Sequence, residues 1–491
     1  MGNANTELNM KKNTDSNTDV NSAEVNKHVN NCANKDSDCK INKADVETIA
    51  KNAKSASLKL GNLSGSQKNS ALNEIAVQIL RRKEEILNAN QQDIERSKSI
   101  PAAMLKRLTL DDDKLREMAE SIRQVASLED PVGKTLECTE LDSGLELFRM
   151  TTPLGVIGAV FEARPDAVTQ IASLCLKSGN AAILKGGVEA ERTSQILVSI
   201  MSGSVEKITG IRNAIQLIHT RDDVREMLSL SRYIDLIVPR GSKSFVQYIQ
   251  ANTRIPVLGH ADGICHIYID SGAETGKAAD ICFDAKVQYP AVCNAVETIL
   301  VHEHIAEKFL PILADMFREK VEMRCDAKSK KIIGPGKYSV KDATEKDWAT
   351  EYNDFIVSVK VVSGIHEAIK HINTYGSGHT DAIVTNIKEN AEIFLREVDS
   401  SSVFWNCSTR FADGFRYGKG AELGISTGKL HARGPVGLEG MVLYKYMLMG
   451  DGHTVADYAS GTKQFTHKKL GKKLSLQGDK MQEPENGRKR V

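Results

Sequence analysis

The chain has 491 residues, of which 41% are hydrophobic and 26% charged, and its formal net charge is +1 at pH 7. This length exceeds one ordinary core, so we expect two or three domains, and the balanced charge excludes a general attraction to nucleic acid. The nine cysteines show no CxxC pair, which argues against a disulfide framework or structural zinc and favours reduced thiols in the cytosol. No apolar run approaches the roughly 18 residues that a membrane helix needs, so no stable membrane insertion is expected.

Both ends of the chain are polar. Residues 1–40 are rich in Asn, Ser, Asp and Lys, a composition that cannot bury enough apolar surface to fold, so we predict a disordered tail. The first six residues, Met1 to Thr6, fit the loose M-G-x-x-x-[ST] pattern for acylation of Gly2. A second tail, residues 470–491, carries basic clusters and is predicted to be a solvated end.

The first folded part is predicted to be helical. Apolar residues recur at three- and four-residue spacing from Ile41 to Ser97, with a break and helix cap at residues 64–66. A further helix is expected from Asp111 to Leu128. The alternating segment 136–151 turns around Asp142-Ser143-Gly144 and predicts a β-hairpin.

A strand–helix–strand unit follows the hairpin. The apolar run 155–161, the helical stretch 167–176 and the run 180–185 have the spacing of one βαβ unit in a doubly wound parallel sheet, although no G-x-G-x-x-G fingerprint is present. Gly241-Ser242 comes directly before a helix, where free N–H groups favour a phosphate. Further strands are predicted at 215–219, 234–238, 264–269, 295–302, 355–362, 403–406 and 442–447.

Cys293 stands in a turn that leads into an apolar, β-leaning run. A thiol in that place is held rigidly, and a neighbouring backbone N–H can bind an oxyanion on an attacked acyl group. The alternative is a buried cysteine that acts as a small apolar residue. The sequence around it, QYPAVCNAVETILVH with Asn294 after the cysteine, resembles the nucleophile loop of the aldehyde dehydrogenase superfamily, and most closely that of the γ-glutamyl phosphate reductases.

The resemblance extends from about Lys43 to about Lys469 and implies an α/β fold of the aldehyde dehydrogenase type. The parts that it and the composition imply are a disordered tail (1–40), an NADPH-binding domain (41–133 and 152–262), an oligomerisation arm (134–151 and 438–460), a catalytic domain (263–437) and a basic tail (470–491). Strand 442–447 is expected to pair with the arm of a partner subunit, in a homo-oligomer.

The resemblance also assigns the cofactor contacts. Lys185 matches the lysine that holds the adenosine ribose, Gly241 and Ser242 the pyrophosphate turn, and Glu351 the contact to the nicotinamide ribose. Relatives that prefer NAD carry a carboxylate where Val188 stands. Its absence favours NADPH, although the adjacent Glu189 leaves NAD open.

Two segments, 408–414 and 425–440, resemble the γ-glutamyl phosphate reductases rather than other aldehyde dehydrogenases. The substrate of that family carries a carboxylate and a phosphate, so cations and hydroxyls must flank the sulfur. The candidate substrate contacts are Arg164, Ser408, Thr409, Arg410, His431 and Arg433. No glutamate occurs between Glu226 and Glu274, where oxidising relatives place a water-activating base, and Asp262 is the carboxylate left for that role.

The activity implied is the NADPH-dependent reduction of L-glutamyl 5-phosphate to L-glutamate 5-semialdehyde in proline biosynthesis, with Cys293 as nucleophile, Asn294 beside it as an oxyanion contact, and no metal. A glutamate 5-kinase on another polypeptide is expected to supply the acyl phosphate. Two alternatives stay open. One is NAD-dependent oxidation of a small semialdehyde, and the other is a non-catalytic scaffold that uses the tails.

Overall fold

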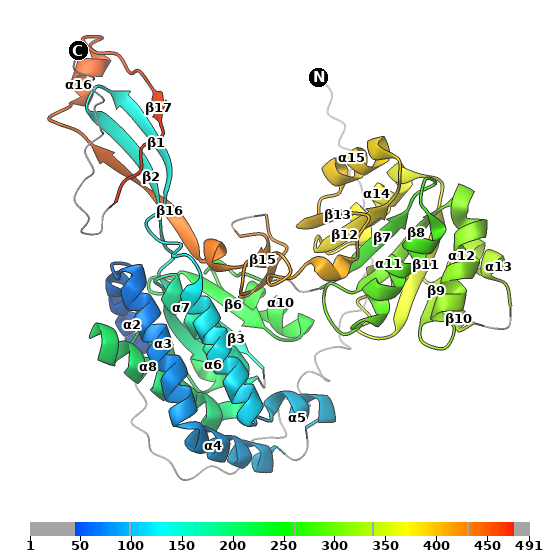
Figure 1. The fold of residues 1–491 in the computed structure, drawn as a ribbon, viewed down its shortest axis with the longest axis horizontal. Coiled ribbons are helices and arrows are strands. Elements are labelled where there is room, and N and C mark those ends of the chain that lie inside the picture. Colours follow the sequence, from blue (N-terminus) through cyan, green and yellow to red (C-terminus); the bar gives the residue numbers. More distant parts are fainter. Residues whose placement is uncertain are drawn as a thin grey trace, which may run out of the picture. The chain divides into compact units, whose positions relative to one another are not determined.

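The computed structural model describes residues 45–97, 100–162, 164–259, 262–335, 338–429 and 432–475. All of them lie in the unit that begins at Asp45. Figure 1 draws their helices and strands. The predicted N-terminal tail with its acylation pattern, His260, His431 and most of the basic C-terminal tail lie outside the described residues. Among the described residues, no helix combines the length and the apolar character needed to cross a membrane.

Five helices open the described chain: α2 (Val46–Leu60), α3 (Gly65–Arg81), α4 (Lys83–Arg96), α5 (Ala102–Leu108) and α6 (Asp112–Ser127). The predicted break is confirmed, because Ser64 caps α3 in a capping box with Gln67. A second break at Arg82, which separates α3 from α4, was not predicted, since no glycine or proline marks it. The helix predicted at 111–128 is α6, capped by the Asp111 side chain.

The first sheet is parallel and has the order β5-β4-β3-β6. Its strands are β3 (Val156–Phe161), β4 (Ala181–Lys185), β5 (Ile215–Leu217) and β6 (Leu236–Arg240), and the helices between and after them are α7 (Pro165–Lys177), α8 (Glu191–Thr209), α9 (Arg221–Met227) and α10 (Lys243–Ala251). Every residue of β3 and β4 is buried. The predicted strand–helix–strand unit is therefore confirmed as β3-α7-β4.

The second sheet is also parallel, with the order β10-β9-β11-β8-β7-β12-β13. Its strands are β7 (Cys265–Ile269), β8 (Val296–His302), β9 (Glu322–Cys325), β10 (Val340–Asp342), β11 (Ile356–Val362), β12 (Thr380–Val384) and β13 (Ser402–Trp405), and its helices are α11 (Thr275–Val287), α12 (Glu303–Phe317), α13 (Ala327–Ile333), α14 (Ile365–Tyr375) and α15 (Lys388–Glu397). Strand β8 lies between β11 and β7, so the chain leaving Cys293 enters the buried centre of this sheet. The α/β class is thus confirmed.

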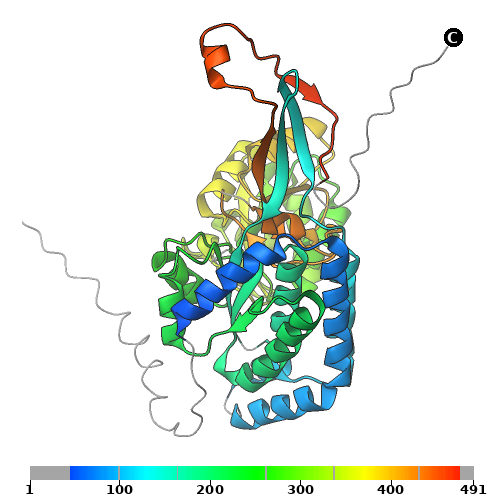
Figure 2. The same cartoon turned by 90° about the vertical axis from the view of Figure 1, so that its left-hand side faces the viewer.

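A third sheet is antiparallel and has the order β16-β2-β1-β17 (Figures 1 and 2). It consists of β1 (Thr135–Asp142), β2 (Leu145–Pro153), β16 (Val442–Met449) and β17 (Lys468–Leu470), with α16 (Val455–Ala459) against the hairpin turn, where the Tyr458 hydroxyl donates to Asp142 at 2.9 Å. The hairpin prediction is confirmed, with Gly144 at φ +75° in the turn.

The expected pairing of strand 442–447 with the arm of a partner subunit stays a prediction. In this structure β16 pairs with β2 of its own chain, from Val442 opposite Pro153 to Met449 opposite Glu146. The hairpin leaves two open edges, and the returning chain fills one with β16 and the other with β17. Buried Phe148 and Met150 form a small core with Met447 on this intrachain sheet.

Candidate active site

Cys293 lies in the loop 288–295, between the end of α11 and the start of β8. It is half-buried, whereas four of the other described cysteines, at positions 175, 265, 282 and 325, are buried in the two parallel-sheet regions. The position is the one predicted, a loop that enters a buried strand. The thiol therefore combines a rigid backbone with partial access.

Gly263 and Cys265 lie against the backbone of Cys293. A Cβ atom added at Gly263 would be 2.2 Å from the carbonyl oxygen of Cys293 and 2.4 Å from its Cα. The Cys265 thiol donates a hydrogen bond to the same carbonyl at 3.2 Å. Gly263 lies just before β7 and Cys265 is its first residue, so the strand beside β8 sets the position of the nucleophile's backbone.

The segment 408–412 holds the other side of the loop. The Thr409 hydroxyl donates to the carbonyl of Asn294 at 2.7 Å, and the Asn294 amide donates to the carbonyl of Ala412 at 2.9 Å. Arg410 donates from Nε to the side chain of Gln288 at 2.9 Å. The structure thus brings Thr409 and Arg410, which the sequence singled out, to the nucleophile loop.

These hydrogen bonds give three of the predicted site residues a structural role. Asn294 is 5% exposed, and its amide nitrogen already binds Ala412, so it ties two loops together. The hydroxyl of Thr409 is likewise committed inside the protein, and Ser408 accepts from the backbone N–H of Arg410 at 3.3 Å. Ser408 and Thr409 therefore shape the loop, and their contacts to the substrate, like the contact of Asn294 to the oxyanion, stay predictions.

The environment of Cys293 strongly favours the protonated thiol. Burial raises the pKa of Cys293 to about 12, and the carboxylates of Glu422 and Glu351 add to the rise. Its own backbone N–H and the guanidinium of Arg240 lower that pKa in part. The predicted Glu351 therefore helps to raise the pKa of the thiol. Glu422 and Arg240 were missed, although Glu422 lies shortly before the signature segment 425–440 and Arg240 directly precedes the Gly241-Ser242 turn.

Lys185 ends β4 at the carboxyl edge of the first parallel sheet, as predicted, and is 8% exposed. Burial lowers the pKa of Lys185, and the carboxylate of Glu189 opposes this. A pocket beside the strand end is lined by Gly186, Gly187, Val188, Glu191, Ser194, Leu217, Ile218 and His219. Pockets at this edge are where open α/β sheets bind ligands.

The Gly241-Ser242 turn precedes α10, with Ser242 at the N-cap. The Ser242 backbone N–H donates to a carboxylate oxygen of Glu162 at 3.2 Å. An anionic oxygen thus already occupies an N–H of this turn, which fits the phosphate contact predicted there. Together with Lys185, these residues fit a dinucleotide.

The remaining predicted contacts lie among carboxylates. Arg164 pairs with Asp166 at 2.9 Å, and Arg433 pairs with Asp399 at 3.2 Å. Asp262, the alternative water-activating base, is held by Lys243 at 2.7 Å. Within the described residues, no group of three or more His, Cys, Asp or Glu side chains is arranged to hold a metal ion.

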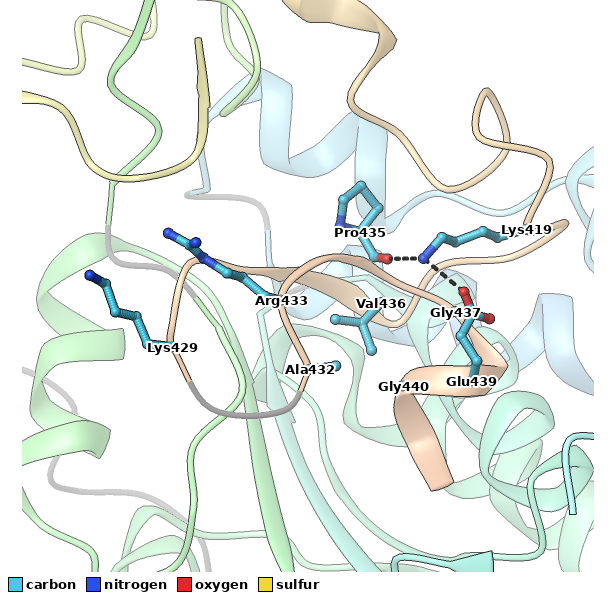
Figure 3. Close-up of a pocket in the computed structure, with 9 residues that line it drawn as sticks. All are labelled: Lys419, Lys429, Ala432, Arg433, Pro435, Val436, Gly437, Glu439 and Gly440. Carbon is cyan, nitrogen blue, oxygen red and sulfur yellow. Dashed lines mark hydrogen bonds and ion pairs between the residues drawn. The ribbon is translucent and has the colours of Figure 1, made fainter. Parts of the chain in front are cut away.

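Arg433 lines a cavity of about 400 Å³ in the segment that also carries β15 (Gly434–Val436) (Figure 3). Lys429 and Arg433 extend in the same direction, and Asp399 contacts both. Lys419, on the other side, binds the carbonyl of Pro435 at 2.9 Å and the Glu439 carboxylate at 2.8 Å. The cavity is therefore rich in cations, each of which has an anionic or carbonyl partner.

Two parallel sheets, with a half-buried cysteine in the loop between α11 and β8, define the class of protein. Comparison with known proteins identifies the family. The chain belongs to the aldehyde dehydrogenase family, whose model matches residues 19–341. Its relatives include the gamma-glutamyl phosphate reductases of Acetivibrio thermocellus, 54% identical over 88% of this chain and 100% of the relative, and of Pelotomaculum thermopropionicum, 54% identical over 88% and 99%. The crystal structure of gamma-glutamyl phosphate reductase from Thermotoga maritima is 38% identical, covers 84% of this chain and 100% of that one, and has a TM-score of 0.81. These relatives assign the chain to the gamma-glutamyl phosphate reductase branch of the family.

Proposed function

We propose that this protein reduces L-glutamyl 5-phosphate to L-glutamate 5-semialdehyde with NADPH, as a step of proline biosynthesis. The observation that carries the proposal is the nucleophile loop. A half-buried cysteine is fixed from one side by Gly263 and Cys265 and from the other by Thr409 and Arg410. The relatives named gamma-glutamyl phosphate reductase supply the substrate.

The cysteine carries the acyl group in this proposal. The sulfur of Cys293 loses its proton and attacks the acyl carbon of the substrate. The bond between that carbon and the phosphate oxygen breaks. Inorganic phosphate departs, and the acyl group stays on Cys293 as a thioester. The Cys293 backbone N–H, which faces the sulfur, stabilises the oxyanion. A bound NADPH would supply the hydride that reduces the thioester carbonyl. The carbon–sulfur bond then breaks, the aldehyde leaves, and the sulfur regains a proton.

Fixed cations would hold the two anionic ends of the substrate. Arg410 is 8% exposed, and Cys293 is among the groups that influence its pKa, which burial lowers, so we assign the phosphate to Arg410. Arg433, Arg164 and His431 stay as proposed contacts for the rest of the substrate. For the cofactor we propose Lys185, Gly241, Ser242 and Glu351, with Val188 favouring the 2′-phosphate.

The setting follows from the same chemistry. A glutamate 5-kinase on a separate polypeptide would supply the acyl phosphate. The seven described cysteines are free thiols, in line with a reducing compartment, and we propose the cytoplasm.

Assaying the reverse reaction tests the proposal. The full chain is mixed with L-glutamate 5-semialdehyde, NADP and inorganic phosphate, and absorbance of the reduced nicotinamide is followed. We expect reduction of NADP that requires phosphate, because phosphate must release the acyl group from Cys293, and loss of activity in Cys293→Ser. Equal rates without phosphate would instead indicate oxidation to the free acid. Activity retained by Cys293→Ser would remove the cysteine from the reaction.

A further inference from the structure

A buried ion pair closes the base of the nucleophile loop. Lys286 lies in the last turn of α11, just before the loop 288–295, and Glu297 is the second residue of β8, just after it. The Lys286 ammonium lies 2.7 Å from the Glu297 carboxylate, and both side chains are fully buried. The pair therefore joins the two ends of the segment that carries Cys293.

A buried ion pair contributes little to the free energy of folding. Removing two charges from water costs several kcal/mol, and replacing a buried pair by apolar side chains is often neutral or stabilising by about 1–4 kcal/mol. Stability gives no reason for charges here, so their position is the informative feature.

The other contacts of the loop differ in kind. Cys265, Thr409, Ala412 and Arg410 bind the loop to strands and segments distant in the chain. The Lys286–Glu297 pair instead sets the distance between the loop's own ends. A loop whose ends are fixed has fewer conformations to lose when its nucleophile meets the substrate.

The same pair lies against the turn that carries Glu351. The Lys286 ammonium is 6.0 Å from the centre of the Tyr352 ring. Burial raises the pKa of Glu297 to about 7, Lys286 and the backbone of Asn353 oppose the rise, and the Glu351 carboxylate adds to it. Burial also lowers the pKa of Lys286. One buried pair thus contacts both the nucleophile loop and the turn proposed to hold the nicotinamide ribose.

We propose that Lys286 and Glu297 are positioning residues, whose ion pair fixes the base of loop 288–295 and so holds Cys293 in register with the Glu351 turn. The inference rests on the proposed function for its kinetic consequence, but not for its effect on the thiol. If the pair is removed, the loop keeps its distant contacts, yet its base loosens and water gains access to Cys293.

The test uses the full-length double variant Lys286→Met/Glu297→Leu, which replaces the charges by apolar side chains of similar size. Alkylation of Cys293 by iodoacetamide at pH 8 is measured by peptide mass spectrometry relative to Cys407, which is also half-buried. We expect the Cys293:Cys407 ratio to rise at least about fivefold, because a hydrated thiol ionises more readily. We expect kcat to fall at least about tenfold while KM changes less than about threefold.

Two further variants complete the design. Lys68→Met removes another buried lysine, whose pair with Asp130 at 2.6 Å lies in the region of α3. We expect this control to lower the melting temperature and leave the alkylation ratio unchanged. Glu297→Gln keeps a hydrogen-bond acceptor for Lys286, and we expect its kcat to lie between those of the parent and the double variant. If the double variant does not fold, the alkylation ratio and kcat of Glu297→Gln test the proposal: a raised ratio and a lowered kcat support it, and parental values overturn it.

The proposal fails if the folded double variant keeps the parent's alkylation ratio and kcat, because the pair would then be structural only. It also fails if Lys68→Met changes the ratio as much as the double variant does. The alkylation arm needs no substrate, so it stays informative even if the parent shows no phosphate-dependent reduction of NADP. A parent protein without phosphate-dependent reduction of NADP would overturn the proposed function and leave the positioning role of the pair intact.

Discussion

Gly263 has no side chain, and this allows the backbone of Cys293 to lie directly against it. A Cβ at Gly263 would meet the carbonyl oxygen of Cys293 at 2.2 Å, and backbone cannot yield as a flexible side chain can. We therefore expect Gly263→Ala to displace the nucleophile loop and lower kcat at least about a hundredfold, since a shift of about 1 Å at a reacting atom can cost that much. Steady-state kinetics of the reverse reaction measure it.

The matched control is Gly276→Ala. Gly276 lies in the first turn of α11, the helix that leads to the same loop, and a Cβ there meets nothing within 4 Å. We expect parental kcat and a slightly higher melting temperature, because alanine favours helix by up to about 1 kcal/mol over glycine. Parental activity in Gly263→Ala would show that the loop relaxes without cost.

Single residues with a local signal could be predicted from the sequence, and residues that act across the chain could not. Cys293 stands before an apolar run, and Lys185 ends one, so each has a pattern around it. Gly263 reaches the backbone of Cys293 only because β7 pairs with β8. Glu422 affects the thiol only because segment 408–412 is bound to the loop and Gly414 to Glu422. The pattern of residues along the sequence does not show which distant segments lie close together in the fold.

At the scale of elements, His371 in α14 makes a testable link between packing and pH. The side chain is 4% exposed, and its ring contacts those of His266, Trp348 and Tyr375. Burial, and then the charges of His266 and Lys360, lowers the pKa of His371 to about 3. The folded protein therefore holds this histidine neutral at pH values where an unfolded chain would protonate it.

The sign of the effect follows from proton binding. Above pH ~6.5 neither state binds the proton, and below that pH the unfolded state binds it first, so stability falls by about 1.4 kcal/mol per pH unit as the pH drops toward the folded pKa. We expect about 2 kcal/mol to be lost between pH 7 and pH 5 through His371. In His371→Leu, the difference between the urea midpoints at the two pH values should shrink accordingly.

His366 provides the control for that experiment. It is an exposed histidine in the same helix, so His366→Leu should leave the difference between pH 7 and pH 5 unchanged. If His371→Leu shows the parent's full pH dependence, the buried histidine is not the group that destabilises the protein in acid.

Elements with a clear period were predictable, and those that depend on their neighbours were not. The apolar runs gave β3, β4, β8 and β11 with boundaries within one or two residues. Strand β9 (Glu322–Cys325) alternates charged and apolar residues over only four positions, too short a signal to detect. The strand at 442–447 was expected and extends to Met449, but its pairing with β2 was not predicted. The sequence of an edge strand does not indicate which strand it pairs with.

At the scale of the whole molecule, the antiparallel sheet raises the question of what covers β16. This strand ends the sheet order, and its side chains Tyr444, Tyr446 and Leu448 alternate along one face and are 50%, 61% and 56% exposed. An exposed apolar edge strand of this length invites pairing with another chain. We therefore keep the prediction that this sheet is the oligomerisation arm, with β16 as the contact.

The prediction is tested with Tyr446→Asp/Leu448→Asp, which places two charges on the exposed face of β16. We expect the parent to be a homo-oligomer by light scattering after size exclusion, and the variant to dissociate, because each buried unpaired charge costs several kcal/mol at an interface. Val455→Asp, in α16 of the same sheet region and 81% exposed, should keep the parent's mass. Since Met447 packs on the opposite face, against the small core of Phe148 and Met150, the charges on β16 should not unfold the arm itself. A double variant with the parent's mass would mean that subunits associate through another surface, and that the exposed tyrosines of β16 serve no contact between them.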